Sequence, residues 1–308
     1  MPEPQQEQHR PGAGAAPPPG VGNLTIGYLL LGLQPIPISL LASQGWNAAD
    51  TVFARFSFSA FCLVLICSLR RRGLRTGNLP VLLLRGVLGA ASVLLYFTAI
   101  QYAGAARGTL LNYTYPIWAN LFAHLLGSKA SRGFWLALAV AFAGTALIVM
   151  PPGGFSAAPI GKGEIAGLLS AMLAGGAVLS IKKLRDTDES LSIIATFTFF
   201  SLLMSAPLAD LPSIALRIND FSVLMTALAV GVLAFSGHVF FTRGYLGASV
   251  QQATLLSLVV PATAAITGIL FLGENFSAQF VWGGLLVTGS LGLLMTSRAI
   301  EARRAPRH

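Results

Sequence analysis

Charged residues are scarce in this chain of 308 residues. They make up 10% of the sequence, against roughly 25% in an average soluble domain, whereas hydrophobic residues make up 54% and the mean hydropathy is +0.71. This small number of charged residues cannot cover a water-facing surface of this size. Lipid must therefore solvate most of the chain. The scarcity excludes an ordinary soluble domain and predicts an integral membrane protein.

Carboxylates are the scarcer of the two charged classes. All eleven Asp and Glu residues lie in tails, loops or the ends of apolar runs, and none lies in the middle of such a run. A carrier driven by protons or cations commonly keeps an acidic residue within the membrane. Their absence argues against the export of lipophilic cations and leaves histidine as the side chain that could carry a proton near neutral pH.

Cysteines are few and enzyme motifs are lacking. Cys62 and Cys67 are five residues apart in one apolar run and would point in different directions on a helix, so no disulfide framework is indicated. The chain has no Gly-x-Ser-x-Gly elbow, no His-Glu-x-x-His helix and no phosphate-cradling glycine-rich loop. We therefore predict that the protein is not an enzyme and needs no cofactor or metal.

The net charge of +9 comes from basic residues in short clusters between apolar runs. Such clusters are typical of cytoplasmic loops rather than of a nucleic-acid-binding surface. If the N-terminus is cytoplasmic, the inside segments hold 15 Lys and Arg residues and the outside loops hold 3. This bias predicts cytoplasmic termini in a bacterial cytoplasmic (inner) membrane, with no nucleic acid as a partner.

Ten apolar runs are long enough for membrane-spanning helices, which need about 20 residues. Their short connections indicate that successive helices are antiparallel neighbours. Residues 1–22 before them are predicted to be a disordered cytoplasmic tail, and residues 299–308 a basic cytoplasmic tail. The runs are Leu24–Ser43, Thr51–Leu69, Pro80–Ile100, Thr109–Leu126, Phe134–Met150, Ile165–Ile181, Leu191–Leu208, Leu224–Thr242, Thr254–Leu272 and Phe280–Ser297.

The two halves of the chain align when one is shifted by 145 residues. Five predicted helices separate equivalent positions, and because five is odd, the halves must be inverted relative to one another. The predicted fold is an all-α membrane protein with ten transmembrane helices as two inverted five-helix repeats, at residues 23–152 and 163–298. The aligned pieces are Gly86-Val87-Leu88 with Gly231-Val232-Leu233, Thr109-Leu110-Leu111 with Thr254-Leu255-Leu256, Pro116 with Pro261, and Gly144 with Gly289.

Four pieces of the sequence carry a family resemblance. They are Arg55, the stretch from Leu84-Arg85-Gly86 through Tyr96-Phe97-Thr98-Ala99, Asn112-Tyr113-Thr114-Tyr115-Pro116, and Leu272-Gly273-Glu274. With them the chain resembles the EamA-type members of the drug/metabolite transporter superfamily over residues 23–298. The first half departs from the family where Ser128 and Lys129 follow Leu126-Gly127, without a glutamate. The resemblance implies ten helices, two inverted repeats and metabolite transport, but no particular substrate.

The apolar run Thr109–Leu126 carries the most polar helix face. On a helix, six of its residues fall within an arc of about 120°. Amide and imidazole groups that faced lipid would lack partners, so we expect this arc to face the bundle interior or a watered cavity. Bonding to neighbouring helices as structural glue is the alternative. The six residues are Thr109, Asn112, Tyr113, Pro116, Asn120 and His124, and all but the proline are candidates for substrate binding.

Four further candidates for substrate binding lie elsewhere. Gln34 precedes Pro35-Ile36-Pro37, whose prolines free two carbonyls, and either substrate or a neighbouring hydroxyl could fill that polar gap. His238 either packs within its apolar run or carries a proton. Tyr96 belongs to the family-like stretch, and Ser257 lies on the inverted counterpart of the polar arc.

Two prolines and one arginine have competing interpretations. Pro116 and Pro261 should bend their helices, either as gating hinges or as ordinary kinks. Arg55 is expected to pair with Asp50 at the outer surface or to snorkel, and substrate contact is the minor alternative.

We therefore predict a secondary transporter that moves a small organic metabolite by alternating access. The metabolite is neutral, zwitterionic or anionic, for example an amino acid or a related compound, because amides, hydroxyls and rings can bind it without a buried acid. A membrane scaffold or channel without carrier activity is the alternative. The expected partners are the substrate and the lipid bilayer, and Gly104-x-x-x-Gly108 and Gly163-x-x-x-Gly167 leave a homodimer open.

Overall fold

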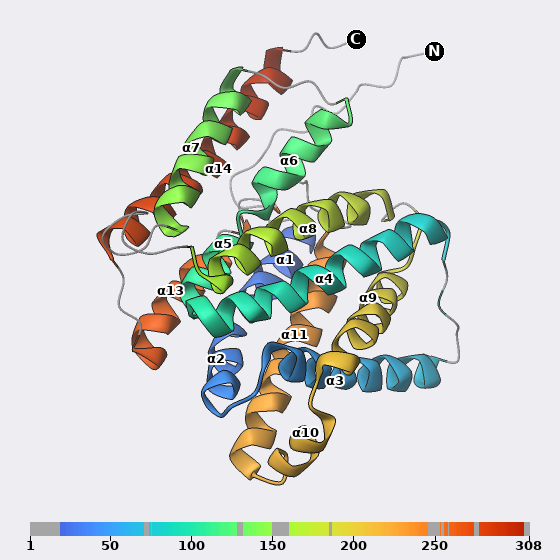
Figure 1. Cartoon of the computed structure of the whole chain (residues 1–308). Helices are drawn as coiled ribbons and strands as arrows, with labels where there is room; N and C mark the ends of the chain where they lie inside the picture. Colours follow the sequence, from blue (N-terminus) through green and yellow to red (C-terminus); the bar gives the residue numbers. More distant parts are fainter. Residues whose placement is uncertain are drawn as a thin grey trace, which may run out of the picture.

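The computed structural model describes residues 19–70, 74, 76–127, 132–149, 160–184, 187–245, 253, 256–257, 259–273 and 277–304. Within these residues all regular structure is helical (Figure 1). The elements are α1 (Pro19–Leu33), α2 (Pro35–Ser43), α3 (Ala48–Arg70), α4 (Leu79–Ala103), α5 (Ala105–Asn112), α6 (Tyr115–Leu125), α7 (Arg132–Val149), α8 (Lys162–Leu184), α9 (Ser190–Ser205), the 3₁₀ turn η1 (Ala206–Leu208), α10 (Leu211–Arg217), α11 (Phe221–Gly244), α13 (Val259–Leu272) and α14 (Ala278–Arg304).

Six stretches of the described chain are long and apolar enough to cross a membrane. They are Gly20–Ser43, Ala48–Leu69, Leu79–Ala103, Lys162–Ile181, Ser190–Leu208 and Phe221–Gly244. Large apolar side chains such as Phe61, Phe199 and Trp282 are exposed on the helices, as lipid-facing positions require. Of the other predicted runs, Thr109–Leu126 is divided between α5 and α6, and the remaining three overlap α7, α13 and α14.

Two helices extend into the segments predicted as tails. Helix α1 begins at Pro19, inside the predicted tail 1–22, because proline is favourable in the first turn of a helix. Helix α14 continues to Arg304, inside the predicted tail 299–308, because no helix breaker occurs before Pro306. Residues 1–18 and 305–308 lie outside the described part of the chain. The short helix α10 was not predicted, and Asp210 caps it by accepting a hydrogen bond from Ser213 N at 3.2 Å.

Prolines divide two of the predicted spans. The first breaks at Gln34, just before Pro35 starts α2, and the fourth breaks at residues 113–114, just before Pro116 in the first turn of α6. Near Pro116 the helix is interrupted by a turn at residues 113–114, as the predicted loss of regular helix at this proline requires. Pro261 lies in the first turn of α13, and residues 254–255 and 258 before it are not described. Whether either proline acts as a hinge stays a prediction.

Glycines let several helices approach closely. At the crossing of α1 and α11, a Cβ on Gly27 would lie 2.8 Å from Phe241 N and 3.0 Å from Gly237 O. Two glycines of the Gly-x-x-x-Gly spacings are used in the same way, since Gly108 packs on the backbone of Ala99 in α4 and Gly163 on that of Ala103. These spacings therefore serve contacts within one chain, and the homodimer stays a prediction with no support from them.

The crossing of α1 and α11 can be tested with a matched pair of substitutions. We expect Gly27→Leu to lower the melting temperature of the detergent-purified protein and its membrane abundance, because overpacking against backbone typically costs about 1–3 kcal/mol. Gly22→Leu, one and a half turns earlier on α1, should have little effect, because a Cβ at this position would have no atom within 4 Å. Equal melting temperatures for the two variants would contradict this packing.

Two aspartates connect α3 and α9 at both ends. Near the start of α3, Asp50 Oδ1 accepts a hydrogen bond at 2.8 Å from the backbone N–H of Asp210, which follows the end of η1. Just before α9, Asp188 accepts from the backbone N–H groups of Gly77 at 3.0 Å and Asn78 at 3.2 Å, which follow the end of α3. An aspartate at or just before the start of each helix thus binds the backbone of the segment that follows the other helix. We call these the two aspartate contacts.

Candidate functional site

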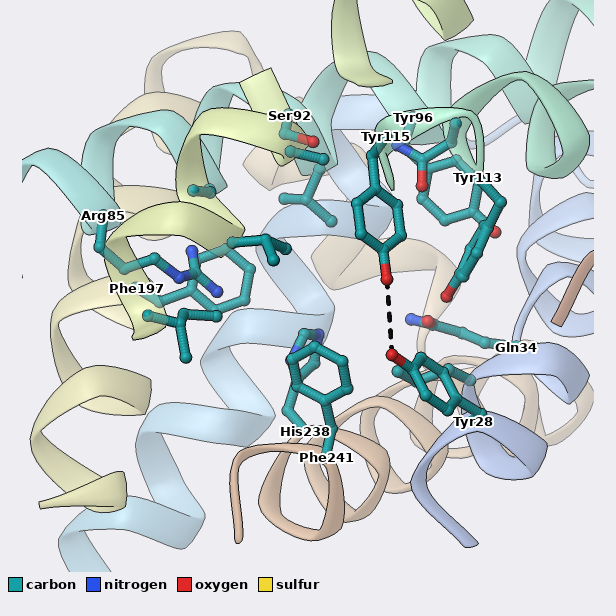
Figure 2. Close-up of a pocket in the computed structure, with 18 of the residues that line it drawn as sticks. Tyr28, Gln34, Arg85, Ser92, Tyr96, Tyr113, Tyr115, Phe197, His238 and Phe241 are labelled. Carbon is teal, nitrogen blue, oxygen red and sulfur yellow. Dashed lines mark hydrogen bonds between the residues drawn. The ribbon is translucent and has the colours of Figure 1, made fainter. Parts of the chain in front are cut away.

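A cavity of about 120 Å³ lies where α1, α3, α4, α8, α9 and α11 converge with the breaks in the first and fourth predicted spans (Figure 2). Its volume exceeds what a single water molecule needs. Apolar side chains such as Val93 and Ile181 alternate with polar ones in its wall. The polar residues of the wall are Tyr28, Gln34, Arg55, Arg85, Ser92, Tyr96, Asn112, Tyr113, Tyr115 and His238.

The two helix breaks supply polar groups to the cavity. Gln34 lies between α1 and α2, while Asn112 and Tyr113 lie where α5 ends. Interrupted backbone at membrane depth is tolerated where it is enclosed by protein or lines a cavity. The prolines that follow, Pro35 and Pro116, therefore fix the positions at which polar residues enter the site.

Hydrogen bonds hold several of the wall residues in place. Tyr28 and Tyr115 share a bond between their hydroxyls at 3.4 Å, drawn as a dashed line in Figure 2. Asn112 Nδ2 donates to Ser170 Oγ on α8 at 2.7 Å. Tyr96 OH lies 3.0 Å from the hydroxyl of Thr109. Asn112 thus connects α5 to α8, a helix from the other half of the sequence.

Both arginines of the site are buried in the helix bundle. The guanidinium of Arg55 lies 4.5 Å from the ring centre of Phe56 and 5.4 Å from that of Phe97. The guanidinium of Arg85 lies 4.7 Å from the ring centre of Phe197. Such cation–π contacts are favourable when the cation is desolvated. Among the described residues of the cavity wall, no carboxylate accompanies these cations.

The prediction that Arg55 pairs with Asp50 or snorkels is wrong. Arg55 is 2% exposed, so its guanidinium does not reach the surface. The Asp50 carboxylate instead accepts from Asn47 N at 2.9 Å and from Asp210 N at 2.8 Å. Five positions along a helix rotate a side chain by roughly 140°, so the two residues face different directions. Arg55 instead lines the cavity, and the minor alternative, substrate contact, stays a prediction.

The structure brings together some of the predicted substrate-binding residues. Thr109 is fully buried behind Tyr96, and His124 lies near the end of α6 with its ring 5.2 Å from that of Trp135. Ser257 is buried but is not a wall residue, and the side chain of Asn120 lies outside the described residues. The members that line the cavity are Gln34, Tyr96, Asn112, Tyr113 and His238. A binding role for any of the nine stays a prediction.

Some wall residues were missed as candidates. An arginine in the middle of an apolar run is itself a signal of function, and this signal could have found Arg85. Tyr28, Phe197 and Phe241 gave no such signal, because an aromatic residue in a spanning helix equally suits lipid or packing. Only the convergence of α1, α9 and α11 places these rings around one cavity.

Comparisons with known proteins identify the family. The sequence model of the EamA-like transporter family matches residues 20–150 and again residues 161–296. The pseudopaline exporter CntI of Pseudomonas aeruginosa is 30% identical over 277 residues, covering 86% of this chain and 94% of that protein. The uncharacterized transporter YwfM of Bacillus subtilis is 28% identical over 282 residues, covering 84% and 92%. Human solute carrier family 35 member G1 is 24% identical over 297 residues, covering 89% and 79%.

The fold is also found among solved structures. One crystal structure superimposes with a TM-score of 0.61 at 16% sequence identity, covering 92% of this chain and 98% of the other. At that identity the similarity shows the fold alone. The family matches confirm the resemblance found in the sequence, and the named relatives are transporters rather than enzymes. The chain belongs to the EamA-like transporter family and is an integral membrane transporter.

Proposed function

We propose that this transporter is a secondary carrier that moves a small organic metabolite by alternating access. Ten transmembrane helices form two inverted five-helix repeats in the bacterial cytoplasmic membrane, with both termini in the cytoplasm. The observation that carries the proposal is the cavity, whose wall combines α1 and α3–α6 from the first half with α8, α9 and α11 from the second. In carriers built from inverted repeats, the substrate site lies where the halves meet.

The two aspartate contacts support the inverted arrangement. The two contacts are equivalent. An aspartate near the start of α3 binds the segment after α9, and an aspartate near the start of α9 binds the segment after α3. Such an exchange is expected when two equivalent helices run antiparallel about a pseudo-two-fold axis. The two matches to the family model, one in each half of the chain, support it as well.

The composition of the cavity favours a carrier over a scaffold or channel. A scaffold has no need for buried donors facing a cavity, and an open channel would keep them hydrated. The name of the relative CntI, a pseudopaline exporter, supports transport rather than a scaffold role.

The carrier proposal is tested by flux into proteoliposomes that contain the purified full-length chain. The panel should include amino acids, related organic acids and pseudopaline itself. A carrier gives flux that saturates with substrate concentration, because each cycle passes through one bound complex. Flux that stays linear with concentration would indicate a channel, and absence of flux for the whole panel would favour a scaffold.

Reporter fusions test the proposed topology. The Lys/Arg bias predicts that reporters near residues 75, 130 and 187 lie in the cytoplasm, and that reporters near residues 47, 156 and 214 lie outside. Placement of residues 75 and 187 on opposite sides would contradict the inverted repeats.

A further inference from the structure

Three side chains in the cavity wall hold N–H donors without an acceptor. Among the described residues, the buried nitrogen atoms without a hydrogen-bond partner include Gln34 Nε2, Arg55 Nε, and Arg85 Nε and Nη1. Gln34 and Arg55 are 2% exposed and Arg85 is 6% exposed, so bulk water does not satisfy them. All these atoms are donors, and no acceptor of the wall pairs with them.

The same wall has an excess of positive charge. It contains two guanidinium groups, while its described residues include no Asp or Glu. Removing a cation from water without a counter-ion is costly, and breaking or omitting one partner of a buried pair leaves that cost uncompensated. Contacts with the rings of Phe56 and Phe197 offset only part of it. An anion entering the cavity would supply the missing counter-charge.

Each of the two cations lies over an aromatic ring of its own. Arg55 lies over Phe56, Arg85 lies over Phe197, and the Phe56 and Phe197 rings pack edge to face at 4.9 Å. Gly89 makes room for Arg85, because a Cβ at this position would collide with Arg85 Nη1. Each guanidinium has at least one N–H donor without an acceptor, and guanidinium matches a carboxylate through paired N–H donors.

The two sides of the cavity wall carry different polar groups. Figure 2 shows Arg85 and Phe197 on one side of the cavity, Gln34 and Tyr28 on the opposite side, and His238 between them. Hydroxyl and amide groups thus face Arg85 across the cavity. A ligand that spans this space needs an acidic group toward each arginine and a further acceptor toward Gln34.

We propose that the transported metabolite is an organic acid with at least two carboxylate groups, bound by Arg55 and Arg85. Gln34 donates to a third acceptor of the same molecule. This inference rests on the carrier function proposed above and narrows its substrate from neutral, zwitterionic or anionic compounds to polyanionic ones.

Binding to the purified full-length protein tests the inference. Thermal unfolding and calorimetric titration are run with succinate, glutarate and citrate, with the amide of each acid, and with cadaverine as a dication. At least one acid should raise the melting temperature in a saturable manner, because it binds the folded state. Its amide and cadaverine should have no effect. Arg55→Met and Arg85→Met should each weaken the binding of that acid by about tenfold or more.

The unliganded stability of the variants distinguishes a substrate site from a structural role. Removing a buried cation that has no counter-ion should leave the melting temperature unchanged or raise it by a few degrees, even though binding is lost. Arg243→Met is the matched control, because it removes an exposed cation from α11 and should leave binding intact. Gly89→Ala should weaken binding with no change of charge, because the new methyl group displaces Arg85.

Three outcomes would overturn the inference: no acid stabilises the wild type, the amides bind as well as the acids, or both arginine variants bind normally. If any of these results came with saturable flux of a neutral metabolite, the carrier proposal would be supported. The polyanionic substrate would be contradicted. Acid binding that depends on both arginines, without flux of any compound in the panel, would instead support the anion site and contradict the carrier function.

Discussion

Asn112→Leu is expected to reduce kcat/KM for transport by about tenfold or more while membrane abundance stays close to that of the wild type. The amide of Asn112 lines the cavity, and loss of a hydrogen bond to a charged ligand commonly costs about 1.5–3 kcal/mol. Folding should tolerate the change. Leucine is favourable in a membrane helix. Ser170 Oγ loses the hydrogen bond that it accepts from Asn112 but still donates to Gly167 O at 3.0 Å.

Ser170→Ala is the control for this substitution. It removes the same 2.7 Å bond between α5 and α8 but leaves the Asn112 amide in the cavity. We expect a clearly smaller loss of transport than for Asn112→Leu. Initial rates in proteoliposomes, normalised to reconstituted protein, measure both. Equal losses for the two variants, or low abundance of Asn112→Leu with normal activity per molecule, would assign Asn112 to helix packing instead.

The membrane character, the positions of most helices and the polar face of the fourth span could be predicted from the sequence. These features depend on local composition and on helical periodicity, which are legible without tertiary structure. The polar arc containing Asn112 and Tyr113 does reach the cavity, as expected of groups that lipid cannot satisfy. Its far end does not, because α6 starts a new helix after the break and His124 lies near the end of α6.

The partners of buried charges could not be predicted. Asp50 and Arg55 are close in sequence and opposite in charge, so the sequence alone favours an ion pair between them. In the structure, the carboxylate satisfies backbone N–H groups of Asn47 and Asp210, and the guanidinium lies on aromatic rings. Asp210 is 160 positions away from Asp50 in the sequence, so this contact depends on how α3 and α9 pack. Local pattern carries no information on such contacts.

Proton coupling is expected to depend on His238 or to be absent. No carboxylate is found among the described wall residues, and histidine is the remaining side chain that normally titrates near neutral pH. His238 lies in the wall with its ring 5.3 Å from Phe197, sharing the cavity with Arg55 and Arg85, whereas His124 is not a wall residue. Any proton coupling at this cavity is therefore expected to run through His238. Because the neighbouring Arg55 and Arg85 cations disfavour a protonated imidazole, His238 should take up a proton only when an anionic ligand is bound.

Flux in proteoliposomes with and without an imposed pH gradient measures this coupling. If the wild type accumulates substrate against its gradient when protons are supplied, His238→Gln should abolish the accumulation and keep only downhill flux, since glutamine retains hydrogen bonding but cannot take up a proton at these pH values. His124→Gln should accumulate substrate like the wild type. If the wild type shows no pH dependence, both variants should transport downhill only. Strong proton-driven accumulation that survives in His238→Gln would show that the proton moves through a group outside this cavity.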